Sequence, residues 1–273
     1  MPATRSLTLQ RHLNLYTDTQ GFILEASPLP VPPLTSLLLS SIATETFEVE
    51  LDKQSKEDLL INGTQREYAF KSARWRHPLI LYVDGVLDEG NLGAIARSAY
   101  FLGVDAIITP TRHSAPWSHI ALKASAGAAE AIPIFEVSQA VEFLGRSARS
   151  GWRIYASDAI PPAEQPVLAG VSTDQNVANF ASSVIYTQAR SAKRLPADHC
   201  PVANFPTILM MGAEGTGLRS SLLNLAHYKV GIRHGREVDE VGVDSLNVSV
   251  AASLLCYHML QKPAPRTPGN LLF

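Results

Sequence analysis

The stretch from Leu79 to Thr109, LILYVDGVLDEGNLGAIARSAYFLGVDAIIT, sets the fold class of this chain. It begins with the apolar run LILYVD, which is typical of a buried strand, and ends with a second such run, DAIIT. Between them, apolar residues recur at helical spacing from Leu92 to Leu102, and Gly103 follows as a helix stop. This order predicts two parallel strands joined by a crossover helix.

The same alternation continues toward the C-terminus. Strands are predicted at 132–137 (IPIFEV), 152–158 (WRIYASD), 207–212 (TILMMG) and 228–233 (YKVGIR). Helices are predicted at 119–131 (HIALKASAGAAEA), 138–149 (SQAVEFLGRSAR), 218–227 (LRSSLLNLAH) and 245–261 (SLNVSVAASLLCYHMLQ). The fold class is therefore α/β, a parallel sheet flanked by helices. Residues 159–205 break the rhythm, and we interpret them as an insertion or flexible loop.

The composition limits which classes of function are possible. The 273 residues are 46% hydrophobic and 18% charged, with a net charge of −2, so a nucleic-acid site has to be a local basic patch. The two cysteines, Cys200 and Cys256, have no metal-ligand spacing and exclude a disulfide framework, which fits a reducing compartment. We expect no metal, and no apolar run is long enough to cross a bilayer.

The first 78 residues do not have the pattern of a self-standing domain. Residues 1–17 contain Arg5 and Arg11 but no acid, which suits a mitochondrial transit peptide or arises by chance in a short window. The Pro-rich run SPLPVPPL, 27–34, should be extended. A basic cluster follows, and composition favours a solvated linker over a phosphate site there. Its members are Arg66, Lys71, Arg74 and Arg76.

Three local motifs stand where predicted strands lead into helices. The first is Asn91 with Arg97, separated by a helical rise of about 9 Å. The second is the Gly-rich turn MGAEGTGL, 211–218, which carries Glu214, and the third is SLNVSVA, 245–251. Ligands bind at the carboxyl ends of strands in open α/β sheets, so each motif stands at a candidate site. Each also has an ordinary interpretation, namely a helix cap, a solvent-facing arginine or a simple turn.

In this order, NLGAIAR, MGAEGTGL and SLNVSVA resemble the three motifs of the SpoU/TrmH-like RNA ribose methyltransferases of the SPOUT superfamily. The resemblance covers about two thirds of the chain, Leu79 to Leu260. At the front, LNLYTDTQGFILEASPLP resembles the end of the RNA-recognising domain in the mitochondrial large-subunit rRNA methyltransferase branch. The chain then looks like a shortened member, with residues 1–78 as a remnant and linker, 79–262 as the methyltransferase domain and 263–273 as a tail.

The resemblance implies methyl transfer from S-adenosylmethionine to a guanosine ribose 2′-hydroxyl in mitochondrial large-subunit rRNA. It also implies a C-terminal trefoil knot, a homodimer, and a mitochondrial matrix location. One alternative is a tRNA ribose methyltransferase. Another is a catalytically silent RNA-binding assembly factor, because the loop GIRHGREVDEVGVDSLN, 231–247, lacks the Pro and Met usual in the family. A dinucleotide-binding enzyme is disfavoured, since no G-x-G-x-x-G follows the first strand.

By the same resemblance, each motif residue receives an expected role. Arg97 grips the phosphate near the hydroxyl and stabilises the developing alkoxide, since a protonated arginine is a poor base. Asn91 orients that group, while Glu214 faces the cationic cofactor or bonds backbone amides of its loop. The expected catalytic residues are Arg97, Asn91, Glu214, Ser245 and Asn247; those binding the cofactor are Met211, Gly212, Gly215, Ile232, Leu246 and Asn247; those binding RNA are Arg66, Lys71, Arg74, Arg76 and Arg97.

Overall fold

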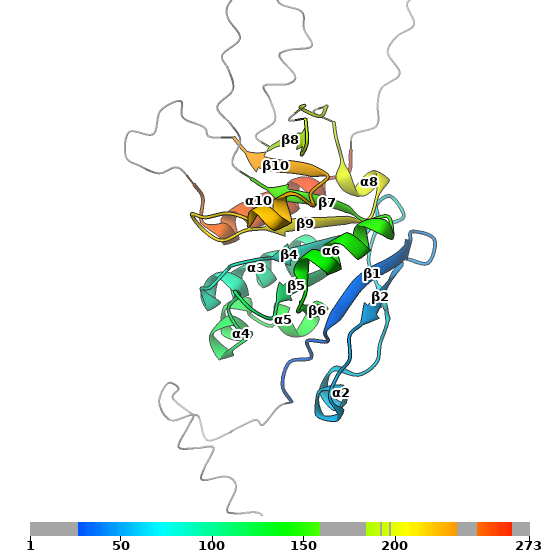
Figure 1. Ribbon diagram of the computed structural model, residues 1–273, viewed down its shortest axis with the longest axis vertical. Coiled ribbons are helices and arrows are strands. Elements are labelled where there is room, and N and C mark those ends of the chain that lie inside the picture. The colour runs from blue at the N-terminus through cyan, green and yellow to red at the C-terminus, as the bar shows by residue number, and fades with distance from the viewer. Residues whose placement is uncertain (1–26, 159–183, 192, 197, 234–244, 264–273) are drawn as a thin grey trace, which may run out of the picture.

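The structure is a computed structural model that describes residues 27–158, 184–191, 193–196, 198–233 and 245–263. The transit-peptide-like start, most of the altered loop at 231–247 and nearly all of the tail lie outside these residues. Within them, a seven-stranded sheet runs in the order β6-β5-β4-β9-β7-β10-β8 (Figure 1). Its strands are β4 (Leu79–Val83), β5 (Ala106–Pro110), β6 (Ile134–Val137), β7 (Arg153–Ser157), β8 (Val184–Gln188), β9 (Thr207–Met211) and β10 (Tyr228–Ile232).

The apolar strand runs are explained by burial on both faces of this sheet. All five residues of β4 are buried, with Leu79, Leu81 and Val83 in one core and Ile80 and Tyr82 in the other. All pairings in the sheet are parallel except that of β8, which runs antiparallel to β10 at the edge. The predicted α/β class with a mostly parallel sheet is confirmed.

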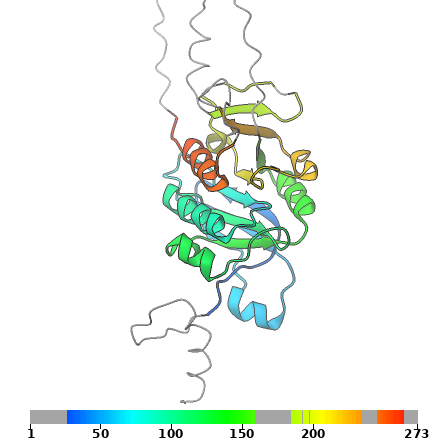
Figure 2. The same cartoon turned by 90° about the vertical axis from the view of Figure 1, so that its left-hand side faces the viewer.

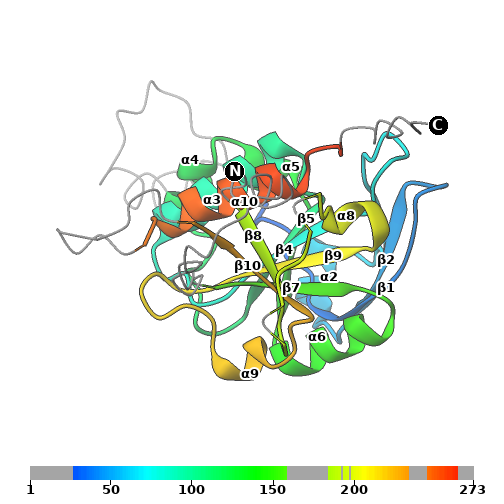
Figure 3. The same ribbon diagram turned by 90° about the horizontal axis from the view of Figure 1, so that it is seen from above.

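One face of the sheet is covered by α3 (Glu89–Leu102), α4 (His119–Ser125), α5 (Ala128–Ala131) and α10 (Val248–Met259) (Figures 2 and 3). Gly93 lets α3 approach α4, since a Cβ there would stand 2.2 Å from the Ala121 carbonyl oxygen. The segment predicted as helical at 119–131 is helical but is divided into α4 and α5. Ala126 and Gly127 have φ of 52° and 89°, which end α4 and begin α5.

The other face is covered by α6 (Ala140–Arg149), the short α9 (Ser220–Leu223) and a small antiparallel sheet. That sheet contains β1 (Leu34–Ser41), β2 (Thr46–Leu51) and β3 (Glu67–Ala69), with α2 (Lys56–Asn62) between β2 and β3. The backbone N–H of Leu37 donates to Ser147 Oγ at 3.0 Å, and Trp152 Nε1 donates to the Leu38 carbonyl at 2.7 Å. The first part of the stretch interpreted as a solvated linker, residues 55–69, instead contains α2 and β3 of a small folded unit that docks on α6.

Two other expectations need correction. Part of the predicted insertion at 159–205 is regular structure, because β8 and α8 (Pro201–Asn204) lie in it, while 159–183 falls outside the described residues. The helix predicted at 218–227 shrinks to α9. Leu222 is buried in the core, and the chain after α9 turns and begins β10. The apolar residues of 218–227 therefore provide a core contact and a turn instead of a long helix.

The basic cluster supplies a structural ion pair. Arg76, 4% exposed, binds Asp105 with both terminal nitrogens, at 2.6 and 3.0 Å. Its guanidinium also donates to the carbonyls of His77, Lys71 and Gly103. Burial raises the pKa of Asp105, and the bonds from Arg76 oppose that rise. The prediction that Arg76 binds RNA is wrong, because its donors are used inside the protein.

Candidate functional site

The Gly-rich turn follows β9 at the carboxyl edge of the sheet. It closes on itself through two backbone bonds between Ala213 and Gly217, at 3.2 and 2.9 Å. Gly215 and Gly217 have φ of 82° and 67°, in the left-handed region that favours glycine. A Cβ on Gly212 would lie 2.3 Å from the backbone carbon of Gly217. Glycine is thus required at 212 by the turn itself, whatever ligand it faces.

Glu214 stands at the tip of this turn. Its side chain is exposed, and within the described residues its carboxylate accepts no hydrogen bond and pairs with no cation. The suggestion that Glu214 holds the loop through backbone amides is therefore not supported, because the Ala213–Gly217 bonds do that. An exposed, unengaged carboxylate beside a rigid turn is suited to a cationic ligand.

The first motif lies at the N-terminus of α3. Asp88 is the N-cap, and its carboxylate accepts the Asn91 backbone N–H at 2.6 Å. Asn91 is thus the third residue of the helix and not its cap, so its side chain is available for other contacts. Its Oδ1 accepts a hydrogen bond from Asn247 Nδ2 at 3.0 Å.

Asn247 joins the third motif to the first. Its Oδ1 caps α10 by accepting the Ser249 backbone N–H at 2.9 Å, while its Nδ2 reaches Asn91. One amide group therefore fulfils the capping role and also links two motifs separated by 156 residues. Ser245 and Leu246 lie just before it, both exposed at the start of the described segment that leads into α10.

The Gly-rich turn adjoins the loop before α3. The Asp84 N–H donates to the Met211 carbonyl at 2.8 Å, extending the β4–β9 pairing by one residue. Gly85 has a φ of 75°, and a Cβ added to it would meet the Ala213 Cβ at 3.0 Å. Met211 itself is a core side chain, 2% exposed, so it can face a ligand only through its main chain. The loop before α3 and the start of that helix thus contact both other motifs.

Sequence reasoning missed a charged pair at this edge, Asp84 with Arg219. Asp84 accepts Arg219 Nε at 3.0 Å and Nη2 at 2.7 Å, and Tyr82 Oη donates to it at 3.4 Å. The bonds to Asp84 raise the pKa of Arg219, and burial raises the pKa of Tyr82. A polar residue ending the otherwise apolar run LILYVD was the available signal, because a buried carboxylate needs a partner.

The other predicted residues lie on α3, at the end of β10 and in the Gly-rich turn. Arg97 lies on α3 beyond Asn91, exposed and without an acidic partner in the described part of the chain. Ile232 ends β10, half-buried, at the edge where β9 also ends. Gly215 is exposed in the turn. The structure thus brings the first and third motifs into contact and places the turn beside the first.

The basic residues Lys71 and Arg74 lie elsewhere. The chain around them leads to Arg76 and the start of β4, which is the amino edge of the sheet. The five residues of β4 separate the two edges by roughly 16 Å, at about 3.3 Å per residue. Arg66 is exposed at the start of the β3 region, in the small sheet. The structure does not gather these cations around the motif residues.

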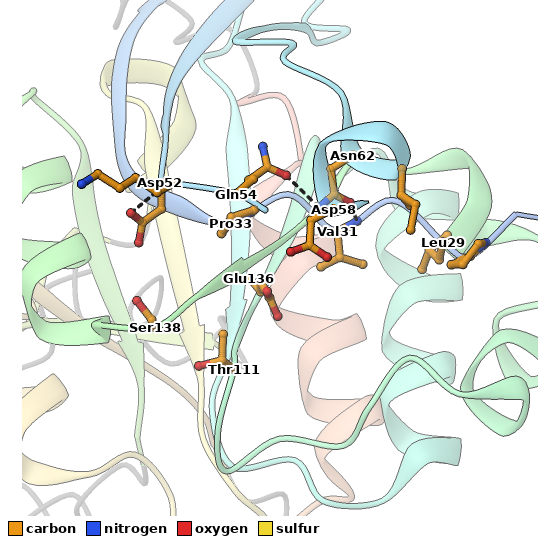
Figure 4. Close-up of a pocket in the computed structure, with 13 residues that line it drawn as sticks. Leu29, Val31, Pro33, Asp52, Gln54, Asp58, Asn62, Thr111, Glu136 and Ser138 are labelled. Carbon is orange, nitrogen blue, oxygen red and sulfur yellow. Dashed lines mark hydrogen bonds between the residues drawn. The ribbon is translucent and has the colours of Figure 1, made fainter. Parts of the chain in front are cut away.

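A cavity of about 410 Å³ opens between α2, the segment 28–33 and the ends of β5 and β6 (Figure 4). Asp52, Asp58 and Glu136 line it, against one cation, Lys53. Burial raises the pKa of Glu136, and the nearby Asp58 adds to the rise. None of the predicted site residues lines it, and its acidic lining disfavours phosphate, so we place the candidate site at the three motifs.

Within the described residues, no group of three or more His, Cys, Asp or Glu side chains is arranged to hold a metal ion. A helix both long and apolar enough to cross a membrane is likewise not found in that part of the chain.

The chain is similar to several named RNA methyltransferases. The rRNA methyltransferase 1, mitochondrial, of Schizosaccharomyces pombe is 34% identical over 92% of this chain and 72% of its own length. The protein of the same name from Saccharomyces cerevisiae is 30% identical over 95% of this chain and 60% of its own length. The 23S rRNA (guanosine-2'-O-)-methyltransferase RlmB of Haemophilus ducreyi is 31% identical over 70% of this chain and 62% of its own length.

The chain thus spans only about three fifths of the last two relatives. The SpoU rRNA Methylase family model matches residues 78–257, which include all three motifs, the Asn91–Asn247 bond and the Asp84–Arg219 pair. From this match and these relatives, the chain belongs to the SpoU rRNA methylase family.

Proposed function

We propose that this protein transfers a methyl group from S-adenosylmethionine to a ribose 2′-hydroxyl of a guanosine in mitochondrial large-subunit rRNA. The observation that carries the proposal is the hydrogen bond from Asn247 to Asn91, at 3.0 Å. It holds the third motif against the first, whose loop also contacts the Gly-rich turn through Asp84 and Met211. Arg97 and Glu214, which have no charged partner among the described residues, stand on the helix and the turn that these contacts join.

The residues at this corner fit the cofactor. S-adenosylmethionine carries cationic and apolar parts, and it supplies the methyl group when bound. Glu214 offers an exposed carboxylate for a cation, and the rigid turn from Gly212 to Gly217 offers backbone donors and acceptors. Leu246, 45% exposed, and the half-buried Ile232 offer apolar surface. In this proposal these residues, with Met211 and Gly215, bind the cofactor.

Arg97 provides the charge stabilisation. Its guanidinium stays protonated, so it acts as a donor and not as a base. Exposed on α3 without an acidic partner in the described residues, it is free to grip an RNA phosphate and to stabilise the alkoxide that develops at the 2′-oxygen. Asn91, fixed by Asn247, orients the same group, and Ser245 supports it.

The names of the relatives support the choice of RNA and compartment. Two are called mitochondrial rRNA methyltransferases and a third a guanosine-2'-O-methyltransferase acting on 23S rRNA. On this ground we propose rRNA over tRNA as the substrate and the mitochondrial matrix as the location. The docked unit at 34–69 is then the part of the front segment that contributes to RNA binding, through cations such as Arg66.

Two features of architecture belong to the same proposal. Membership of the SpoU rRNA methylase family supports a C-terminal trefoil knot, a rare exception to the rule that protein chains are unknotted. On α10, Val250, Leu254 and Tyr257 are 46%, 43% and 56% exposed and share one helix face by their spacing. An apolar face of this kind supports a homodimer, which sedimentation velocity at several protein concentrations tests.

The deciding experiment combines calorimetry with methyl transfer. We expect the purified chain to bind S-adenosylmethionine and to transfer its labelled methyl group to unmodified mitochondrial large-subunit rRNA. Arg97→Ala should leave cofactor affinity within about twofold and lower the transfer rate by roughly 100-fold or more, the usual effect of removing one transition-state donor. Normal transfer by that variant would refute the role of Arg97. Cofactor binding without transfer by the parent would favour a silent assembly factor.

A further inference from the structure

Arg219 follows directly on the Gly-rich turn, and Asp84 directly on β4, so the two meet at the carboxyl edge of the sheet. The pair is asymmetric. The Asp84 side chain is 3% exposed, whereas that of Arg219 is 49% exposed. The contact is bidentate, with Nε at 3.0 Å and Nη2 at 2.7 Å from the two carboxylate oxygens. A buried anion therefore fixes a half-exposed cation by one edge.

The other edge of the guanidinium is open. An arginine has five N–H donors, and Asp84 receives one from Nε and one from Nη2. Tyr82, beside Asp84, also interacts with the guanidinium, while Nη1 makes no hydrogen bond within the described part of the chain. A surface arginine normally gives up side-chain entropy to hold one geometry, but here Asp84 has already fixed it. The outer donors of Arg219 are presented to solvent in a preset direction.

Arg219 lies across the sheet edge from the Asn91–Asn247 bond. Tyr82 belongs to the core under α6 and α9, and Asp84 points to the same side because side chains alternate along a strand. Asn91 and Asn247 lie on α3 and α10, which cover the other face. Both groups stand at the carboxyl edge of the sheet, which is where ligands of open α/β sheets bind.

We infer that Arg219 binds a phosphate of the RNA backbone and positions the substrate strand, with Asp84 holding its guanidinium in the binding orientation. This inference rests on the proposed function and adds a residue to that site. The fixed fork matches phosphate oxygens bidentately, and its order before binding lowers the entropy lost on complex formation. The ligand is a phosphodiester of single-stranded RNA, and the carboxylate of the cofactor is the competing partner that the test separates.

The test uses a variant that leaves no buried charge unpaired. Arg219→Gln alone would strand the Asp84 carboxylate, so we combine it with Asp84→Asn. Binding of short overlapping fragments of mitochondrial large-subunit rRNA is measured by fluorescence anisotropy across a salt series, without cofactor. Loss of one phosphate contact to single-stranded RNA should make the negative slope of log K against log salt shallower by about 0.7. Cofactor affinity, by calorimetry, should change less than about twofold.

Arg146→Gln is the matched control. Arg146 lies on α6 with its side chain 41% exposed, and it pairs with Glu142 at 2.6 Å and Glu50 at 3.6 Å. It is a comparably exposed arginine with carboxylate partners but without a buried one, so its removal should leave the slope unchanged. Arg219→Lys is the second variant. It keeps the charge and loses the fork, so the slope should stay while affinity falls severalfold.

Two results would overturn the inference while leaving the proposed function standing. One is a parent that transfers methyl groups and a double variant with an unchanged salt slope. The other is an unchanged slope with cofactor affinity reduced tenfold, which would assign Arg219 to the cofactor. If the parent protein bound neither S-adenosylmethionine nor RNA, the proposed function would be refuted together with this inference.

Discussion

Arg76→Met is the substitution whose effect the structure determines most closely. Arg76 makes two bonds to Asp105 and one each to the carbonyls of His77, Lys71 and Gly103, between 2.6 and 3.0 Å. The Arg76 and Asp105 side chains are 5% and 4% exposed. The methionine fills much of the same volume but leaves the carboxylate buried without its cation.

The expected loss of stability is large because only one partner of a buried pair is removed. Breaking such a pair costs about 3–5 kcal/mol of unfolding free energy, and each degree of melting shift corresponds to roughly 0.3–0.5 kcal/mol in a chain of this size. We therefore expect a melting temperature lowered by roughly 10 °C. Adding Asp105→Asn removes the stranded charge and keeps an acceptor for the Leu79 N–H, so it should restore at least about 2 kcal/mol.

Urea unfolding followed by circular dichroism measures these free energies. Arg74→Met serves as the control, since Arg74 is exposed in the same loop, and its effect should stay within about 0.5 kcal/mol. If Arg76→Met lost less than about 1 kcal/mol with an unchanged denaturant slope, the buried-pair reasoning would be refuted. A changed RNA salt slope in the folded variant would restore Arg76 as an RNA-binding residue.

Three further predictions concern the turn, the motif bridge and pH. Gly212→Ala should disrupt the turn and lower cofactor affinity in calorimetry, because its Cβ would meet the Gly217 backbone at 2.3 Å. Gly145→Ala on α6, whose Cβ would make only an ordinary contact with Arg149 Nη1 at 3.8 Å, should slightly stabilise the fold in urea unfolding. Asn247→Ser keeps a helix cap but loses the bond to Asn91, so stability should change by less than about 1 kcal/mol while methyl transfer falls; equal losses of both would contradict separate roles. Burial lowers the pKa of His258, as it does for His77, His199 and His227, so the unfolded chain takes up protons first and stability should drop as pH falls below about 6.5. His258→Gln should reduce the slope of this profile in urea unfolding, and an unchanged slope would refute the contribution of His258.

The sequence by itself determined the fold class and the candidate motifs. Alternating apolar runs predicted the sheet and its helices, because burial on both faces leaves few polar residues in a parallel strand, as in β4. The motif residues Asn91, Gly212 and Asn247 stand where the chain leaves strands or enters helices, which local spacing reveals. The family match covers residues 78–257, the part of the chain that contains those motifs.

Only the tertiary structure decided which polar side chains meet. Arg76 and Arg74 are alike in sequence, but one is buried against Asp105 and the other is exposed, because their partners come from distant parts of the chain. Asp84 and Arg219 are 135 residues apart, and no sequence pattern links them. They meet because β4 and β9 are neighbours in the sheet. Local spacing fixes periodicity and turns, whereas ion pairs and amide bridges depend on strand order, which the sequence does not encode at any single position.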